Sequence, residues 1–234
     1  MSPPVPFAAH VAVVAGTLTA FVPSIAAVWA RRVSWRDPVG QVAIAWTVMA
    51  VVGALGPIRF YFGIGPALPI ASLVFVLFPL LLLPPTMTWM GPRVARWRWW
   101  AMGAWCVVAA IALATLGSGR VLDTVAFPAM AAGMGALSGL AIASRVHGGP
   151  ERISRQGWFW ILTAHVIYFV TDIFRWPLLE SLVERHWEFL FDINNGVLWI
   201  YAAIYVMIAR GIVLAREPAP SAQSASAPRV RTVA

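Results

Sequence analysis

Seven apolar stretches, each about as long as a bilayer-crossing helix, constrain this chain more than any other feature. They run roughly from Ala8 to Ala30, Val39 to Ile58, Pro66 to Met90, Trp99 to Gly117, Val121 to Ser144, Gly157 to Trp176 and Leu190 to Val213. About 20 apolar helical residues cross a bilayer core, where no water is available to satisfy exposed backbone groups. The composition, 60% hydrophobic and only 11% charged, departs from that of ordinary soluble domains and argues against a soluble globule. We expect an all-α polytopic membrane protein with seven transmembrane helices.

The distribution of charge predicts the orientation of these helices. All 17 basic residues are arginines, and positive residues accumulate in cytoplasmic loops. With the N-terminus outside and the C-terminus cytoplasmic, the inner segments hold 13 arginines and three acids, a net charge of +10, whereas the outer side holds four arginines and six acids, −2. The basic composition therefore indicates orientation in a cell inner membrane rather than direct nucleic-acid binding, and the lipid bilayer is the first expected partner.

The domain organisation follows the same pattern. Residues 1–215 are expected to form one seven-helix transmembrane bundle. The segment 216–234 is rich in proline, alanine and serine, cannot bury enough apolar surface to fold alone, and is predicted to be a disordered cytoplasmic tail. Between the sixth and seventh spans, apolar residues from Leu178 to Leu190 recur at helical spacing, which predicts a short amphipathic helix on the outer surface.

The sixth predicted span carries four polar side chains on one face. They are His165, Tyr168, Asp172 and Arg175, separated by three, four and three positions. Ionisable groups inside a span are costly and therefore indicate function. Two interpretations stay open: a helix-end pair of Asp172 and Arg175 with a hydrogen-bonded His165, or one face of an outward-opening cavity.

The start of the seventh span is also polar. Asp192, Asn194 and Asn195 lie in its first two turns, and each buried amide needs hydrogen-bond partners. We expect either bonds between the sixth and seventh helices or a ligand or coupling site shared with the polar face of the sixth. At other outer helix ends, Arg59, Arg120 and Asp123 are candidates for a polar outer vestibule.

Tryptophans and small residues suggest how the helices pack. Trp46, Trp105 and Trp199 lie deeper than the other tryptophans, where we expect packing rather than the wall of a ligand site. Gly135 and Gly139 lie four apart in the fifth span, and small residues let helices approach closely. Packing inside the bundle is the favoured interpretation, with a homodimer through this face as the alternative.

Several kinds of chemistry are excluded or unsupported. The topology resembles that of microbial rhodopsins, but the chain has no lysine, which excludes a retinal Schiff base. The lone Cys106 excludes a disulfide framework, and the four scattered histidines predict no haem or metal site. We therefore predict no cofactor and assign no catalytic residue.

Three functions remain as hypotheses. The first is a membrane regulatory or sensory protein that conveys a stimulus to a cytoplasmic partner, for example a transcription or sigma factor held at the membrane, which would make it a signalling protein acting in transcription regulation. The second is a transporter of small molecules or ions with a polar site between the sixth and seventh helices. The third is a membrane enzyme acting on a lipid or isoprenoid, for which no residue spacing gives specific support.

The predicted topology can be tested with a reporter fused after Ala234. Because the inner segments carry the arginine excess, the C-terminus should be cytoplasmic. A reporter that is active only in the cytoplasm should therefore be active in this fusion. A reporter that proves periplasmic would contradict the orientation, and a fusion at the N-terminus should give the opposite result.

Overall fold

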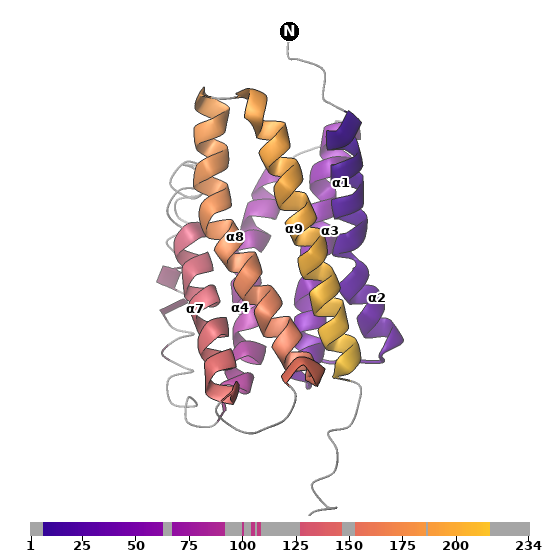
Figure 1. Ribbon diagram of the computed structural model, residues 1–234, viewed down its shortest axis with the longest axis vertical. Coiled ribbons are helices and arrows are strands. Elements are labelled where there is room, and N and C mark those ends of the chain that lie inside the picture. The colour runs from indigo at the N-terminus through magenta and orange to yellow at the C-terminus, as the bar shows by residue number, and fades with distance from the viewer. Residues whose placement is uncertain are drawn as a thin grey trace, which may run out of the picture.

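The computed structural model describes residues 7–62, 67–91, 100, 104–105, 107–108, 127–146, 153–185 and 187–215. Every regular element among them is helical, which confirms the all-α prediction for this part of the chain (Figure 1). In chain order the helices are α1 (Phe7–Ala20), α2 (Val22–Trp29), α3 (Pro38–Phe62), α4 (Ala67–Trp89), α7 (Phe127–Val146), the 3-10 turn η3 (Ile153–Arg155), α8 (Gly157–Arg185) and α9 (Trp187–Leu214).

Within the described chain, five helices are long and apolar enough to cross a membrane. They cover Phe7–Trp29, Pro38–Leu55, Phe127–Val146, Gly157–Arg175 and Asp192–Leu214. The third predicted span corresponds to the 23-residue helix α4; the part of it whose side chains are described, Leu77–Trp89, is apolar but shorter than a full span. The fourth, Trp99 to Gly117, lies almost wholly outside the described residues, as does the tail 216–234. Seven spans and their orientation therefore stay predictions.

The first span is one rod with a break. Phe21 separates α1 from α2, and Pro23 lies in the first turn of α2. Proline has no backbone N–H and its ring crowds the preceding turn, so it is tolerated at the start of a helix but interrupts a continuous one. The two pieces are joined without a loop, since the Phe21 N–H donates to the Leu18 carbonyl of α1 at 3.2 Å and the Phe21 carbonyl accepts the first bond of α2, from the Ile25 N–H, at 3.0 Å.

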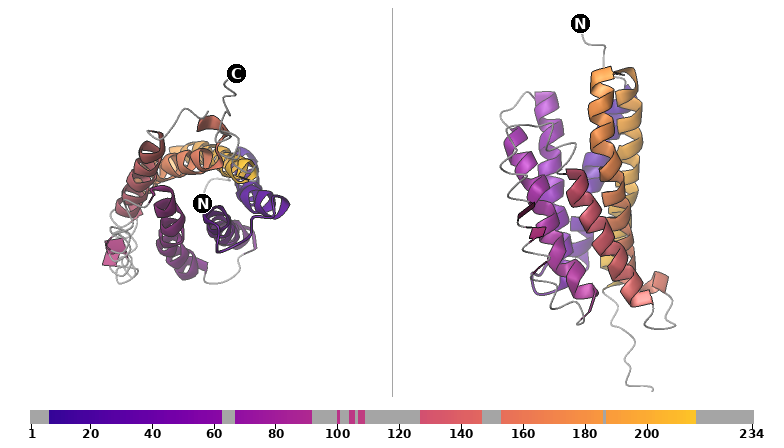
Figure 2. Two further views of the ribbon diagram at one scale, coloured as in Figure 1. Left: turned by 90° about the horizontal axis from the view of Figure 1, so that it is seen from below. Right: turned by 90° about the vertical axis from the view of Figure 1, so that its left-hand side faces the viewer.

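The described helices form a ring in chain order. α3 contacts α4, α4 contacts α7, α7 contacts α8 and α8 contacts α9, while α1 and α2 bridge α9 back to α3. Viewed along the bundle, α7, α8, α9 and α1 make a curved layer, with α3 and α4 on its concave side (Figure 2). Large side chains from all parts of the ring meet inside it, among them Trp46, Phe78, Met130, Leu162 and Ile204, each at most 2% exposed.

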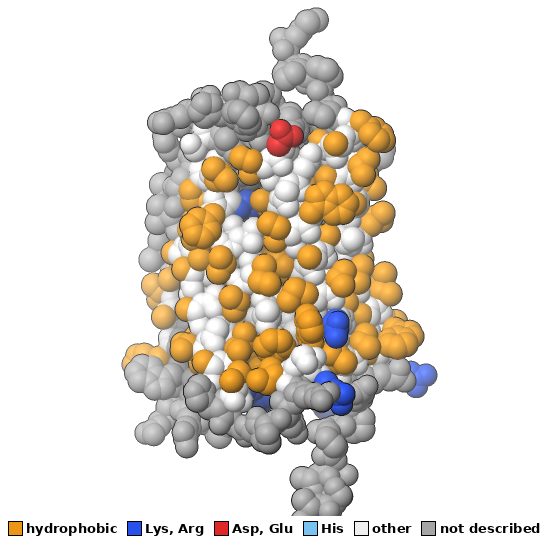
Figure 3. Space-filling view, in the orientation of Figure 1, with side chains coloured by type: hydrophobic (Ala, Val, Ile, Leu, Met, Phe, Trp, Pro, Cys, Tyr) orange, Lys and Arg blue, Asp and Glu red, His pale blue; other side chains and the backbone are white. Residues whose placement is uncertain are grey.

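The outer surface of the ring is apolar as well. Side chains such as Leu18, Val51, Phe174 and Val206 are at least 51% exposed, and hydrophobic groups extend over most of the face in Figure 3. A helix that is hydrophobic on all sides belongs in a large core or in a membrane. Trp199 also points outward at 57% exposure, whereas Trp46 and Trp105 are buried at 0% and 8%. The packing prediction is confirmed for the latter two and wrong for Trp199, because its position on α9 faces away from the ring.

The predicted amphipathic surface helix between the last two spans is not a separate element. α8 continues without a break through Pro177 to Arg185, and α9 begins at Trp187. At 1.5 Å per residue, the 29 residues of α8 extend over about 43 Å, beyond the roughly 30 Å of a bilayer core. Helical spacing of apolar residues shows that a segment is helical but does not give its direction, so the prediction of a separate surface helix was wrong.

Small residues lie at two contacts between neighbouring helices, one of them close. A Cβ added to Gly211 of α9 would lie 2.6 Å from Cγ1 of Ile161 and 2.7 Å from the Gly157 carbonyl oxygen, both in α8. A Cβ added to Gly135 of α7 would lie 3.5 Å from Cβ of Phe169 in α8, whereas a Cβ added to Gly139 would meet no described atom of another helix within 4 Å. Gly135 thus packs inside the bundle, while a homodimer contact at Gly139 stays a prediction.

The Gly211 contact predicts a stability effect. Replacing Gly211 by alanine should lower the free energy of unfolding by about 1–3 kcal/mol, because the new methyl group forces α8 and α9 apart. Thermal unfolding in detergent measures the change. Gly139→Ala is the matched control, since its methyl group enters open space and helix propensity favours alanine by about 1 kcal/mol. Equal destabilisation of the two variants would contradict this account of the contact.

Candidate functional site

The polar face of α8 lies inside the ring rather than on its surface. Helical spacing puts His165, Tyr168 and Asp172 on one side of α8, and their exposed fractions are 0%, 3% and 7%. Arg175, one turn further along, is half-buried at the same side. The prediction that these four residues share one face is confirmed, and the face is directed at α3 and α9.

A tyrosine from α9 links the two charged members of this face. The Tyr201 hydroxyl donates a hydrogen bond to Oδ1 of Asp172, and Nη1 of Arg175 donates to the same hydroxyl oxygen at 3.2 Å. The Arg175 guanidinium also lies over the Tyr201 ring, 5.2 Å from its centroid. Because the carboxylate and guanidinium are opposite in charge and both bonded, the cost of burying them is partly offset.

The sequence identified Asp172 and Arg175 as partners but did not identify Tyr201 as the residue between them. The signal was present, since Tyr201 and Tyr205 lie one turn apart on α9 in an otherwise apolar segment. A tyrosine buried in a bundle needs a partner for its hydroxyl. The predicted bond between the sixth and seventh helices therefore exists, but Tyr201 forms it rather than the asparagines.

The second polar contact joins α3 to α8. Nε1 of Trp46 donates to Nε2 of His165 at 3.1 Å, and the two rings stack with centroids 6.0 Å apart. A ring nitrogen that accepts carries no hydrogen, so the proton of this neutral imidazole is on Nδ1. Nδ1 is buried and has no hydrogen-bond partner among the described residues. Such an unsatisfied buried donor is costly and uncommon in folded proteins.

Trp46 is also the centre of an aromatic cluster. Phe78 of α4, Tyr168 of α8 and Tyr205 of α9 approach its ring edge-to-face with centroids 4.9, 5.0 and 5.5 Å away. Tyr168 in turn lies 5.3 Å from the Tyr201 ring. Edge-to-face pairs are favoured by the charge distribution of aromatic rings. One indole therefore holds four helices together and connects the His165 contact with the Tyr201 contact.

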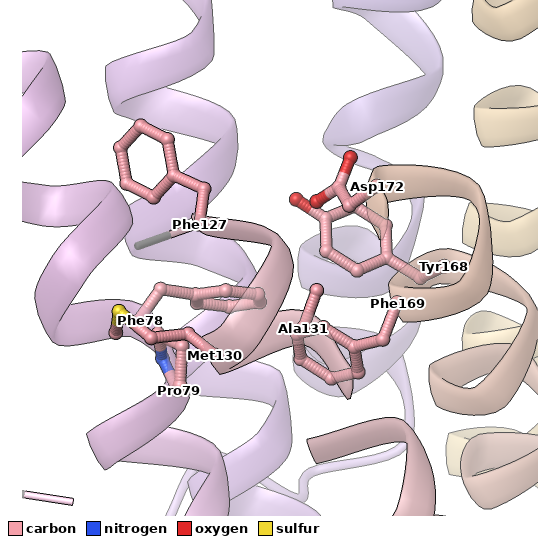
Figure 4. Close-up of a pocket in the computed structure, with 8 residues that line it drawn as sticks. All are labelled: Phe78, Pro79, Phe127, Met130, Ala131, Tyr168, Phe169 and Asp172. Carbon is pink, nitrogen blue, oxygen red and sulfur yellow. The ribbon is translucent and has the colours of Figure 1, made fainter. Parts of the chain in front are cut away.

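A small cavity opens beside Asp172 (Figure 4). It is lined by Phe78, Pro79, Phe127, Met130, Ala131, Tyr168, Phe169 and Asp172, and its volume is about 20 Å³. The Asp172 carboxylate and the Tyr168 hydroxyl lie together at one edge, and the rest of the lining is apolar. This space is sufficient for about one water molecule.

The other predicted site residues are not brought into this cluster by any described hydrogen bond. Asp192 is exposed and Asn194 is half-buried. Asn195 is half-buried with its Oδ1 shielded and without a partner among the described residues. From Asn194 to Tyr201 the rise along α9 is about 10 Å. The asparagines are therefore two turns away from the Asp172 contact, toward the start of α9.

The predicted outer vestibule stays a prediction. Arg59 belongs to the last turns of α3, but its side chain lies outside the described part of the chain, and Arg120 and Asp123 lie outside it altogether. Among the described residues, no group of three or more histidine, cysteine, aspartate or glutamate side chains could hold a metal ion.

Comparisons with protein-family models, with characterised proteins and with solved structures gave no match.

The hydroxyl bridge can be tested with two tyrosines one turn apart. Tyr201→Phe should lower the free energy of unfolding by about 1–3 kcal/mol, because it removes the hydrogen bond that the Tyr201 hydroxyl donates to the buried Asp172 carboxylate. Tyr205→Phe removes a hydroxyl with no described hydrogen bond while keeping the ring that packs on Trp46, so it should have little effect. Thermal unfolding in one detergent compares them, and similar stability of both variants would show that the bridge contributes nothing specific.

Proposed function

We propose that the chain is an integral membrane regulatory or sensory protein whose switch is the polar cluster of α3, α8 and α9. The observation that carries the proposal is the buried pair of contacts, Trp46 to His165 and Asp172 to Tyr201 to Arg175. Polar groups at membrane depth cost more than apolar packing and mark functional positions. Among the described residues, Nδ1 of His165 also has no hydrogen-bond partner, so this cluster is not optimised for stability alone.

The connection of the cluster to one end of the bundle supports a role in signalling. α8 and α9 run from the Asp172–Tyr201 contact to the end where their backbones meet at Gly157 and Gly211. Such a backbone contact leaves little room for independent movement, and packed elements shift between discrete arrangements rather than deforming continuously. A stimulus that breaks the Tyr201 bridge would shift α8 and α9 from one packing arrangement to another. The close glycine contact would carry this shift to the end of the bundle.

The same end of the bundle gathers arginines. Arg31, Arg32 and Arg36 lie between α2 and α3, Arg145 lies in the last turn of α7, and Arg155 and Arg210 lie near the start of α8 and the end of α9. In the orientation that the loop charges favour, this end is cytoplasmic. We propose it as the output surface, where a cytoplasmic protein such as a transcription or sigma factor binds or is released.

Transport is the second candidate, and one observation favours it. The cavity places the Asp172 carboxylate next to a partly open space, as an ion or solute path would. Its volume of about 20 Å³ matches about a single water molecule rather than a continuous path, and we therefore rank transport below sensing. An enzymatic role has no comparable support, because Asp172 and His165 are both used in contacts between helices.

The sensory proposal is tested by asking whether contact with a cytoplasmic partner depends on the Tyr201 bridge. A photo-crosslinking residue replaces Val33, which is 58% exposed between α2 and α3, and adducts are compared in living cells for the otherwise wild-type chain, Tyr201→Phe and Tyr205→Phe. We expect one discrete adduct whose yield changes about fivefold or more in Tyr201→Phe, as for a typical coupling free energy, and is unchanged in Tyr205→Phe.

The absence of an adduct, or equal yields in all three chains at matched abundance, would contradict the sensory proposal. The transport candidate makes a different prediction for the purified chain in liposomes. Flux of an ion or solute that disappears in Asp172→Asn, while the variant stays inserted and folded, would favour transport instead.

A further inference from the structure

One arginine at the arginine-rich end of the bundle differs from its neighbours. Arg210 lies four residues before the end of α9, and its side chain is exposed. The preceding turn presents Val206 to the outside at 55% exposure, and Arg210 belongs to the candidate membrane span Asp192–Leu214. A permanent positive charge therefore lies at the edge of the apolar belt, on the outer surface of the bundle, where Figure 3 shows basic groups next to hydrophobic ones.

The guanidinium of Arg210 is held on an aromatic ring. Its central carbon lies 4.2 Å from the centroid of the Trp160 ring in α8. The ring is fixed in turn, because Nε1 of Trp160 donates to the Ser154 carbonyl oxygen at 2.8 Å. Stacking uses the face of the guanidinium and leaves its N–H groups, which lie at the edge, available for an acceptor.

Two other arginines at this end of the bundle have structural roles, because they bond to acceptors at the ends of helices. Nε of Arg145 donates to the Trp89 carbonyl at 2.7 Å, at the end of α4. Arg32 donates to Asp37 at 3.3 Å and to the Ala215 carbonyl at 2.6 Å. Arg210 has no such contact: in the described chain no carboxylate lies within ion-pair distance of it.

We propose that Arg210, stacked on Trp160, binds the phosphate headgroup of an anionic phospholipid. Phosphate is the anion present at the depth where a membrane helix ends, and the arginine fork bonds two phosphate oxygens at once. Tryptophan favours this interfacial depth. Arg155 follows Ser154 directly and is exposed, so a second positive charge adjoins the site. This second charge favours an anionic over a zwitterionic lipid, whose own cation would be repelled.

The test uses the full-length chain purified in detergent, with native mass spectrometry counting bound lipids. The probes are phosphatidylglycerol, phosphatidylcholine with the same acyl chains, and glycerol phosphate as the soluble headgroup analogue. We expect the first phosphatidylglycerol to bind roughly fivefold less tightly to Arg210→Gln, the loss that corresponds to about 1 kcal/mol for one basic group at a membrane surface. Trp160→Leu should show a similar loss, because the guanidinium loses its platform.

Arg36→Gln is the matched control, because it removes the same charge from an exposed arginine in the segment between α2 and α3. It should keep wild-type affinity. Equal losses for Arg36→Gln and Arg210→Gln, or no loss in either, would overturn the proposal. Equal affinity for the two lipids, or binding of glycerol phosphate as tight as that of the lipid, would also overturn it. Should Arg210→Gln not fold, Arg210→Lys decides: it keeps the charge but loses the planar fork, and wild-type affinity in that variant would contradict the proposed site.

Discussion

The absence of water inside a bilayer is the constraint on which the structure depends. Backbone groups must then be satisfied within each helix, which explains why every regular element of the described chain is helical. The same constraint acts on side chains. Asp172 and Arg175 are tolerated because the Tyr201 hydroxyl bonds to both, so that the carboxylate and the guanidinium compensate each other inside the ring. The polar cluster is therefore part of the packing of α8 against α9.

Trp46 connects the polar cluster to the other helices of the bundle. Its ring contacts Phe78, Tyr168 and Tyr205, and its N–H bonds to His165, so that α3, α4, α8 and α9 meet at one side chain. Core and candidate site are thus the same group of residues. A change in any of these hydrogen bonds therefore alters a contact between helices.

The arginines at the opposite end of α8 and α9 show how equal charges take different roles. The sequence treats them alike, as markers of the cytoplasmic side. In the structure, Arg145 and Arg32 bond to carbonyl groups at the ends of α4 and α9, whereas the Arg210 guanidinium lies over the Trp160 ring. The position of neighbouring acceptors, backbone carbonyls for both structural arginines and also Asp37 for Arg32, separates them from the arginine that we propose binds a lipid.

The sequence by itself determined the helices and one face of the site. Apolar length fixes where a span can lie, and helical periodicity fixes that His165, Tyr168 and Asp172 share a side, because both depend only on residues close together in the chain. It could not distinguish a continuous α8 from a helix that turns at Pro177, since both have the same periodicity. The tertiary structure alone decided the partners of that face. Trp46 meets His165 across 119 positions and Tyr201 meets Asp172 across 29, and such pairs depend on how helices rotate and stack, which no local pattern specifies.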